Sequence, residues 1–239
     1  MRDPHELAQP DRALIWDLDG TIADTKQDIA TGVAAMLGEL GRPVLPLDHV
    51  IRTVGRGVRV LVTLCLEQTG APARDEAEID EAVRVFREHY WRHLMDTTAP
   101  YPLMSDLLHI LKERGRPMAV MSNKPEDATR EILIRMGLID CFAAVLGGDS
   151  LPQRKPSPEP IWRALRLCRE AGTNGHDLNP DHAAIIGDSI NDAQAGWNAG
   201  MPVCGVGWGF DPDGALRASA VDWWFERPAE LKEALLGDV

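Results

Sequence analysis

Seven polar side chains of this chain stand close after apolar, strand-like runs. They are Asp17, Asp19, Ser122, Asn123, Lys155, Asp188 and Asp192. In a parallel sheet the carboxyl ends of the strands lie along one edge, where open α/β folds bind ligands, so we expect these side chains to converge. Clustered carboxylates repel one another unless a cation lies among them, and a hard divalent ion such as Mg²⁺ prefers oxygen ligands. A lysine and a hydroxyl at the same edge suit a phosphate group.

The segment Asp17-Leu18-Asp19 directly follows the apolar run ALIW. In extended geometry the two aspartates point the same way, because they lie two residues apart. One carboxylate could then be a nucleophile and the other a proton donor, while Gly20 would let the backbone approach a ligand closely. Asp and Gly also form ordinary polar turns, and this segment alone does not separate the two interpretations. The other three segments favour a function.

Two further segments could hold an anion. Ser122 and Asn123 precede Pro125, so they could cap a helix, and a hydroxyl and an amide at a helix amino end also form an anion site. These two interpretations are compatible. Lys155 could be an ordinary surface lysine, but Pro156 stiffens the backbone after it, which suits a fixed counter-charge for phosphate.

The last segment supplies two more acidic residues. Asp188 ends a buried run directly after a glycine, which favours a metal ligand. Asp192 could support the same metal, but Ser189-x-x-Asp192 also matches a capping box, as does Thr25-x-x-Asp28 earlier in the chain. We therefore expect a metal role for Asp188 and a metal or helix-capping role for Asp192.

Composition narrows the class of protein. The chain has 239 residues, with 25 Lys and Arg against 37 Asp and Glu, which gives a net charge of −12. Nucleic-acid binders and binders of anionic membranes need basic surfaces, so we expect neither partner. The four cysteines form no CxxC pair, the start is not typical of a signal peptide, and no apolar run is long enough to span a membrane. We expect a cytoplasmic protein that acts as a monomer or a homodimer.

The order of elements predicts an α/β fold. After a flexible tail over residues 1–11, a strand is expected at 13–17, and a helix-rich stretch follows from 24 to 95. Strands and helices then alternate regularly, which indicates a parallel sheet with right-handed crossovers. We expect a Rossmann-like α/β core made of residues 12–23 and 96–239, with flanking helices and a helical cap of residues 24–95 inserted after strand 1.

The chain resembles the haloacid dehalogenase superfamily over nearly its whole length. Four separated segments carry the resemblance, in the family's order and spacing: WDLDGTIADTKQDI, MSNKPEDATREIL, GGDSLPQRKPSPEP and GDSINDAQAGWNAG. The helical insertion after the first segment is similar to the cap of one subfamily. Within that subfamily the chain is most similar to phosphoglycolate phosphatases. Dehalogenase members lack the second aspartate of the first segment, whereas this chain has Asp19.

The resemblance implies a role for each site residue. Asp17 would attack phosphorus and form an aspartyl-phosphate, and Asp19 would protonate the leaving oxygen and then activate water. Mg²⁺ would be held by the Asp17 carboxylate, the Asp19 main-chain carbonyl and Asp188, with Asp192 in support. The phosphoryl oxygens would be held by Ser122, Asn123 and Lys155.

The resemblance also suggests where the substrate is recognised. The break Gly55-Arg56-Gly57 in the helical insertion is a candidate specificity loop, in which Arg56, with Arg59 nearby, would pair with the carboxylate of a substrate such as 2-phosphoglycolate. A solvated loop is the commoner explanation for such residues.

Three other functions fit the same residues. The same chemistry could act on a sugar phosphate, pyrophosphate or a nucleotide. A related phosphomutase would return the phosphoryl group to the substrate. A receiver-like phosphoacceptor module would use a similar aspartate without being an enzyme, although such a chain would be about half this length and would lack the insertion.

Overall fold

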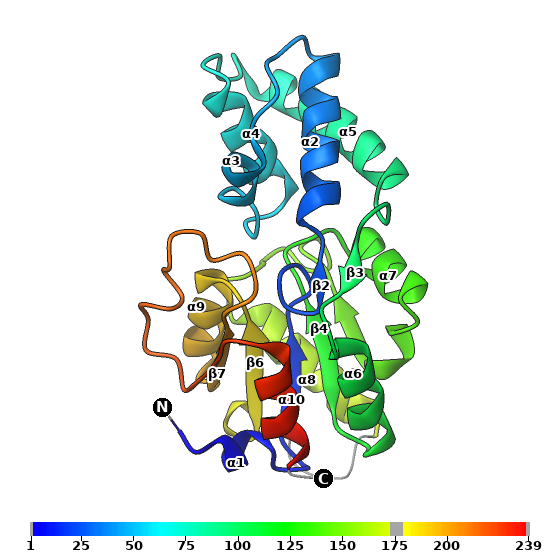
Figure 1. Ribbon diagram of the computed structural model, residues 1–239, viewed down its shortest axis with the longest axis vertical. Coiled ribbons are helices and arrows are strands. Elements are labelled where there is room, and N and C mark those ends of the chain that lie inside the picture. The colour runs from blue at the N-terminus through cyan, green and yellow to red at the C-terminus, as the bar shows by residue number, and fades with distance from the viewer. Residues whose placement is uncertain (1, 173–178, 238–239) are drawn as a thin grey trace.

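A parallel sheet of six strands forms the centre of the larger part of the molecule, which is a computed structural model describing residues 2–172 and 179–237 (Figure 1). The strand order is β5-β4-β1-β6-β7-β8, and every neighbouring pair is parallel. The strands are β1 (Ala13–Trp16), β4 (Met118–Met121), β5 (Ala144–Leu146), β6 (Ala183–Gly187), β7 (Val203–Val206) and β8 (Trp223–Phe225). The predicted Rossmann-like α/β sheet is confirmed, with strand 1 at its centre.

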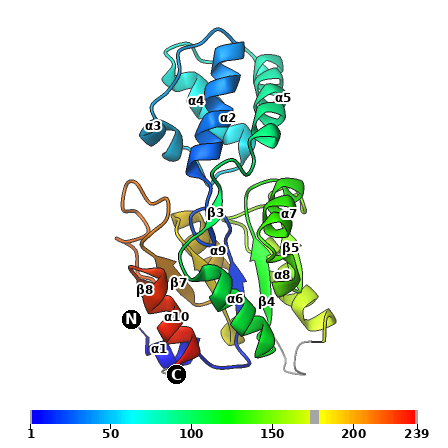
Figure 2. The same cartoon turned by 45° about the vertical axis from the view of Figure 1, so that its right-hand side comes forward.

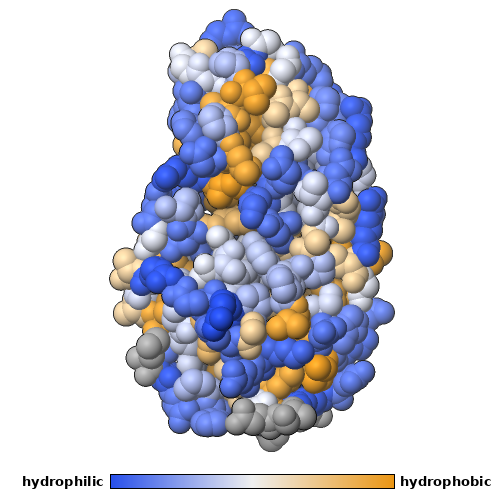
Figure 3. All heavy atoms as spheres, viewed as in Figure 1, coloured by the Kyte–Doolittle hydropathy of each residue, from blue (hydrophilic) through white to orange (hydrophobic). Residues whose placement is uncertain are grey.

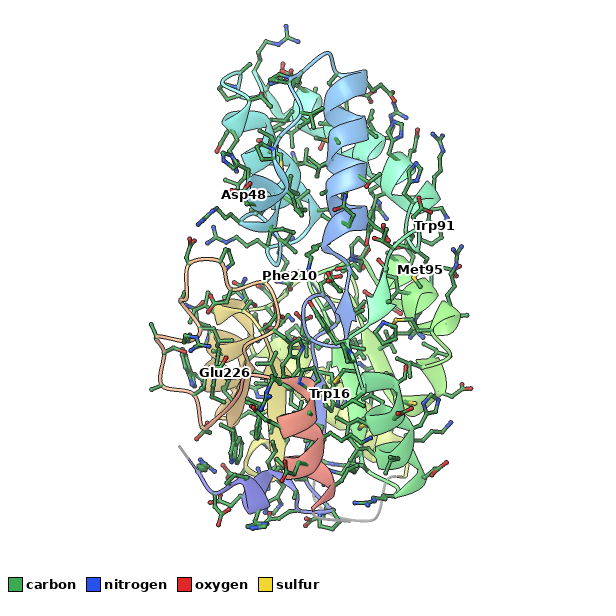
Figure 4. The ribbon with its side chains drawn as sticks, in the orientation of Figure 1. Trp16, Asp48, Trp91, Met95, Phe210 and Glu226 are labelled. Carbon is green, nitrogen blue, oxygen red and sulfur yellow. The ribbon has the colours of Figure 1, made fainter. Side chains whose placement is uncertain are left out.

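Helices cover both faces of this sheet, as the alternation of strands and helices predicts. They are α6 (Met104–Glu113), α7 (Glu126–Arg135), α8 (Glu159–Glu170), α9 (Ile190–Ala199) and α10 (Pro228–Leu236). Successive residues of β1 point to opposite faces, so Leu14 and Trp16 pack with α6 and α10, whereas Ala13 and Ile15 pack with α8 and α9. Figure 4 shows Trp16 deep within the sheet domain.

Four helices form a second body above the carboxyl edge of the sheet, and we call them the cap (Figures 1 and 2). They are α2 (Lys26–Glu39), α3 (Leu47–Ile51), α4 (Val58–Gln68) and α5 (Glu76–Arg92). Two short antiparallel strands, β2 (Ala23–Asp24) and β3 (Ala99–Pro100), carry the chain into and out of the cap. The sequence pattern did not indicate these connecting strands, because each has only two residues.

A buried carboxylate joins the first helix of the cap to the segment that follows the cap in the chain. Asp28, in the first turn of α2, accepts hydrogen bonds from the backbone N–H and the hydroxyl of both Thr97 and Thr98, at 2.7–3.0 Å. Burial alone would raise the pKa of Asp28, but these hydrogen bonds lower it below its ordinary value. Thr25 makes no side-chain capping bond, so the expected Thr25-x-x-Asp28 capping box is absent.

Residues 2–11, which lie in the predicted flexible tail, are mostly exposed and include one short helix. A short helix, α1 (Pro4–Leu7), begins at Asp3, whose side chain accepts a hydrogen bond from the His5 N–H, and Leu7 is fully buried. The Trp223 indole N–H donates to the Asp3 carbonyl at 3.0 Å. Leu7 and the Asp3 helix cap are single residues in a polar segment, so the sequence pattern did not indicate them.

The face of the molecule seen in Figure 3 is mostly hydrophilic, but an apolar strip on the cap runs toward its junction with the sheet domain. Among the described residues, no helix is both long and apolar enough to cross a membrane.

Candidate active site

The loop after β1 places Asp17 and Asp19 at the carboxyl edge of the sheet. The Asp17 N–H donates to the Ile186 carbonyl of β6, which fixes the start of the loop. Gly20 has a φ of +83°, and a Cβ there would lie 2.1 Å from an Asp188 carboxylate oxygen. Only glycine therefore allows this turn to approach Asp188 so closely.

Lys155 forms the first of two buried ion pairs in the site. Its Nζ lies 2.8 Å from Asp17 Oδ1 and 2.6 Å from Asp192 Oδ1. Burial raises the pKa of Asp17 to about 7, although the Lys155 ammonium acts in the opposite direction. Burial alone would lower the pKa of Lys155, but the Asp17 and Asp192 carboxylates raise it above its ordinary value. Lys155 is thus a charged, fixed group.

Asp192 combines two contacts. One carboxylate oxygen binds Lys155, and the other accepts hydrogen bonds from the Ser189 N–H and hydroxyl at 3.0 and 2.5 Å. The expected capping box at the start of α9 is therefore present. The capping bonds hold the carboxylate where it meets Lys155.

Three buried carboxylates gather beside Lys155. Asp17, Asp188 and Asp192 each have an oxygen within 4.8 Å of the others. Asp188 accepts hydrogen bonds from the Thr21 hydroxyl at 2.9 Å and the Phe210 N–H at 2.5 Å. Its pKa is raised by burial and by the two neighbouring carboxylates. One lysine does not balance three buried carboxylates, so this oxygen donor set fits a divalent cation.

The Asp188 site lies near the junction with the cap. Figure 4 shows Phe210, on the chain between β7 and β8, close to that junction. A Cβ at the preceding Gly209 would lie 2.3 Å from the Asp188 Cβ and from the Gly20 carbonyl oxygen. The chain after β7 therefore closes over Asp188 by backbone contact, which leaves no room for a side chain at Gly209.

A second buried ion pair joins Lys124 to Asp19, with the Nζ 2.7 and 2.9 Å from the two carboxylate oxygens. Asp19 also accepts a hydrogen bond from the Thr25 hydroxyl at 2.6 Å. Lys124 was not among the predicted site residues. A signal was available, because Ser122 and Lys124 lie two residues apart after β4 and so point to one side of an extended chain.

Ser122 and Asn123 occupy the same loop but make different contacts. The Ser122 hydroxyl oxygen accepts a hydrogen bond from the Lys124 N–H at 3.3 Å. The Asn123 Nδ2 donates to the carbonyls of Gly55 in the cap, at 2.8 Å, and of Lys155, at 3.0 Å. In this structure the amide N–H groups of Asn123 connect the cap with the sheet domain.

Several of these groups line one cavity between the cap and the sheet domain. Its floor, from the sheet domain, includes Asp17, Asp19, Ser122, Lys124 and Lys155. Its roof, from the cap, consists mainly of the side chains of Ile29, Val54, Val58, Leu61, Phe86 and Tyr90. An apolar roof over a charged floor excludes water and strengthens the electrostatic interactions beneath it.

The structure does not bring Arg56 and Arg59 into this cavity. Both are exposed, and Arg59 pairs with Glu76 and Asp80 of α5 within the cap. The glycines on either side of Arg56 do line the cavity, so the loop is in the expected place while its arginine is not.

The comparisons agree with this architecture. Residues 14–206 match the model of the haloacid dehalogenase-like hydrolase family. A phosphoglycolate phosphatase of Haemophilus influenzae is 34% identical over 92% of this chain and 96% of its own length. One from Psychrobacter arcticus is 39% identical over 83% of this chain and 84% of its own length.

A solved structure shows the same fold. A crystal structure from Haemophilus somnus, titled as a predicted phosphoglycolate phosphatase, superposes with a TM-score of 0.83 at 29% identity. It covers 95% of this chain and 97% of that one. The chain therefore belongs to the haloacid dehalogenase-like hydrolases, and the family resemblance of the sequence is confirmed.

Proposed function

We propose that this chain is a magnesium-dependent phosphatase that hydrolyses 2-phosphoglycolate through an aspartyl-phosphate on Asp17. The observation that carries the proposal is the pairing of Asp17 with Lys155, at 2.8 Å, beside two further buried carboxylates at the cavity between the cap and the sheet domain. Phosphoryl transfer spreads negative charge over three equatorial oxygens, so it needs fixed positive charge more than it needs covalent chemistry.

Asp17 is the proposed nucleophile. A carboxylate that approaches a phosphate dianion is repelled, and the Lys155 ammonium offsets part of that repulsion. Asp17, Asp188 and Asp192, with the Asp19 main-chain carbonyl, would hold Mg²⁺, which when bound would supply further positive charge at the phosphoryl group. The oxygen of Asp17 forms a bond to phosphorus as the bond to the ester oxygen breaks.

Asp19 is the proposed acid and base. In its protonated form Asp19 donates its proton to the departing ester oxygen, and the resulting carboxylate then removes a proton from the water that attacks the aspartyl-phosphate, which returns Asp19 to the protonated form. This second step releases inorganic phosphate and restores Asp17. Ser122, Asn123 and Lys155 are proposed to hold the phosphoryl oxygens. For Asn123 this role requires its Nδ2 to leave the Gly55 carbonyl, because its N–H groups now bind backbone oxygens.

The substrate proposal rests on the relatives and on the cavity. Relatives that align with more than four-fifths of this chain are named phosphoglycolate phosphatases. The mainly apolar roof, which offers few polar groups to a base or a ribose, favours a small ester over a nucleotide.

Phosphate release from 2-phosphoglycolate with added Mg²⁺ tests the proposal, with Asp17→Asn as the matched control. We expect release by the wild type, none after chelation, and none by the control. Activity that survives in Asp17→Asn would exclude Asp17 as the nucleophile. A stable phosphoprotein without phosphate release would indicate a phosphoacceptor module. With a sugar phosphate as a second substrate, transfer of the phosphoryl group to another hydroxyl of the sugar, without phosphate release, would indicate a mutase.

A further inference from the structure

The cavity floor carries two lysines, and each meets a different aspartate. Lys155 Nζ lies next to Asp17 and Asp192, at 2.8 and 2.6 Å, where the phosphoryl group is proposed to bind. Lys124 Nζ lies 2.7 and 2.9 Å from the two oxygens of Asp19. Among the described residues that line the cavity, these two are the only cations. A substrate with an anionic group at each end therefore finds one cation for each.

Asp19 shows which end of a substrate would face Lys124. In the proposed reaction Asp19 protonates the ester oxygen, so the atoms bonded beyond that oxygen lie next to Asp19. In 2-phosphoglycolate the carboxylate is attached to the carbon that carries this oxygen. It would therefore come within reach of the ammonium that now binds Asp19, and it would compete with Asp19 for that ammonium.

Tyr90 adds a second polar group from the cap. Lys124 Nζ lies 5.0 Å from the centre of the Tyr90 ring, and the same ring lines the cavity roof. The Tyr90 hydroxyl is buried beside the Lys124 ammonium, and its own proton has no acceptor among the described residues. Burial raises its pKa to about 12, so the hydroxyl stays protonated as a donor. Because an ammonium can only donate, the buried Tyr90 hydroxyl lacks an acceptor, which is unfavourable unless a ligand supplies one.

We propose that Lys124 and the Tyr90 hydroxyl form the subsite that binds the carboxylate of the substrate, and so determine the preference for an anionic ester. The proposal rests on the proposed function. It assigns the recognition that the sequence suggested for Arg56 to a lysine of the floor and a tyrosine of the roof.

Two substrates of similar size isolate the carboxylate. Wild type, Lys124→Met, Lys124→Arg and Tyr90→Phe are compared on 2-phosphoglycolate and on 2-hydroxyethyl phosphate, whose far end is uncharged. The readout is the ratio of the two kcat/KM values, because loss of the Lys124 contact with Asp19 affects both substrates alike. We expect Lys124→Met to lower this ratio roughly 10- to 100-fold, mainly through KM for 2-phosphoglycolate. Tyr90→Phe should lower it by about 3- to 10-fold, and Lys124→Arg should retain most of it.

Two outcomes would overturn the proposal. Equal losses on both substrates in Lys124→Met would show that Lys124 serves Asp19 or the phosphate and not the carboxylate. If the wild type hydrolyses both esters equally well, the carboxylate subsite is excluded, whereas the proposed phosphatase activity is not. A wild type that hydrolyses neither would instead contradict the proposed function.

Folding is checked separately from activity. Circular dichroism reports folding in each variant, because loss of the Lys124 contact with Asp19 lowers activity on both esters, and Lys112→Met, at an exposed position of α6, is the matched control for loss of a lysine. If Lys124→Met does not fold, Tyr90→Phe alone must still lower the ratio, and an unchanged ratio there overturns the proposal.

Discussion

The floor and the roof of the cavity differ sharply in chemistry. The floor holds two buried ion pairs, Lys155 with Asp17 and Lys124 with Asp19, all from strand ends of the sheet domain. The roof holds apolar side chains and the Tyr90 hydroxyl, and none of the described cap residues that line the cavity is charged. The floor is formed by loops that follow β1, β4 and β5, three neighbouring strands of the sheet, whereas the roof is carried on a body joined through two short strands.

This difference assigns separate tasks to the two bodies. Charges that must act on phosphorus are placed on the sheet domain, and small displacements of such charges would lower the rate. The cap closes the site and keeps water out, which needs shape more than charge. Substitutions in each body can therefore test whether catalysis depends on charge on the floor and on the absence of charge on the roof.

The largest effect is expected at Lys155. Lys155→Met removes the cation that faces Asp17, and we expect kcat to fall by roughly 10²–10³, about 2.7–4 kcal/mol of transition-state stabilisation. Steady-state kinetics with saturating Mg²⁺ measure this loss. Lys155→Arg keeps the charge and should retain more activity than the methionine variant. Equal losses in both would mean that shape, and not charge, matters at this position.

A smaller effect, on stability, is expected at the joint between the two bodies. Asp28→Asn removes the charge that accepts hydrogen bonds from Thr97 and Thr98, which should lower the free energy of unfolding by about 1–3 kcal/mol. Urea denaturation measures this, with Asp48→Asn, at an exposed position of α3 (Figure 4), as the matched control.

The Asp28 effect should depend on pH. The pKa of Asp28 is lowered in the folded state, so its stabilisation is present above the ordinary value of 3.8 and is lost as the pH falls through the lowered folded pKa. The difference between wild type and Asp28→Asn should therefore narrow toward acid pH. A difference that stays constant down to acid pH would mean that the charge of Asp28 contributes nothing.

A new negative charge on the roof should lower kcat/KM about tenfold. Val58, at the start of α4, lines the cavity, and Val58→Asp would place a carboxylate opposite an anionic substrate. Val58→Lys is the matched variant, because it disturbs the packing without repelling the substrate. If the two variants lose activity equally, packing and not neutrality of the roof explains the loss.

The smallest effects are expected outside the cavity. Arg59 is exposed and pairs with Glu76 and Asp80, and such surface pairs contribute about 0–1 kcal/mol to stability. Arg59→Ala and Arg56→Ala should change KM for 2-phosphoglycolate by less than about twofold, given that scale. A selective rise in KM for this substrate in Arg56→Ala would restore the arginine as the carboxylate-binding residue.

The sequence predicted the elements better than it predicted the partners of the side chains. The apolar periods of the long helices and strands indicated α2, α5 and the central strands, because these patterns are local. The strand ends also indicated that Asp17, Lys155 and Asp188 would converge. The pairing of Lys124 with Asp19 joins residues 105 positions apart, and no local pattern specifies which lysine meets which aspartate.

The contacts of two predicted site residues, Arg56 and Asn123, also depend on the folded structure around them. Arg56 lies between two glycines with φ of +93° and +88°, and this backbone turns the loop so that the glycines, and not the arginine, line the cavity. Asn123 is bound by carbonyls of the cap and of Lys155, which become neighbours only after the cap has folded over the sheet.

The most direct test is to identify the residue that carries the phosphoryl group during turnover. The enzyme is mixed with Mg²⁺ and excess 2-phosphoglycolate, quenched in acid within a turnover, digested and analysed by mass spectrometry. The account predicts a phosphorylated peptide that contains Asp17 in the wild type and none in Asp17→Asn. Rapid phosphate release with the phosphoryl group on another residue, or with no phosphorylated peptide at any quench time, would contradict it.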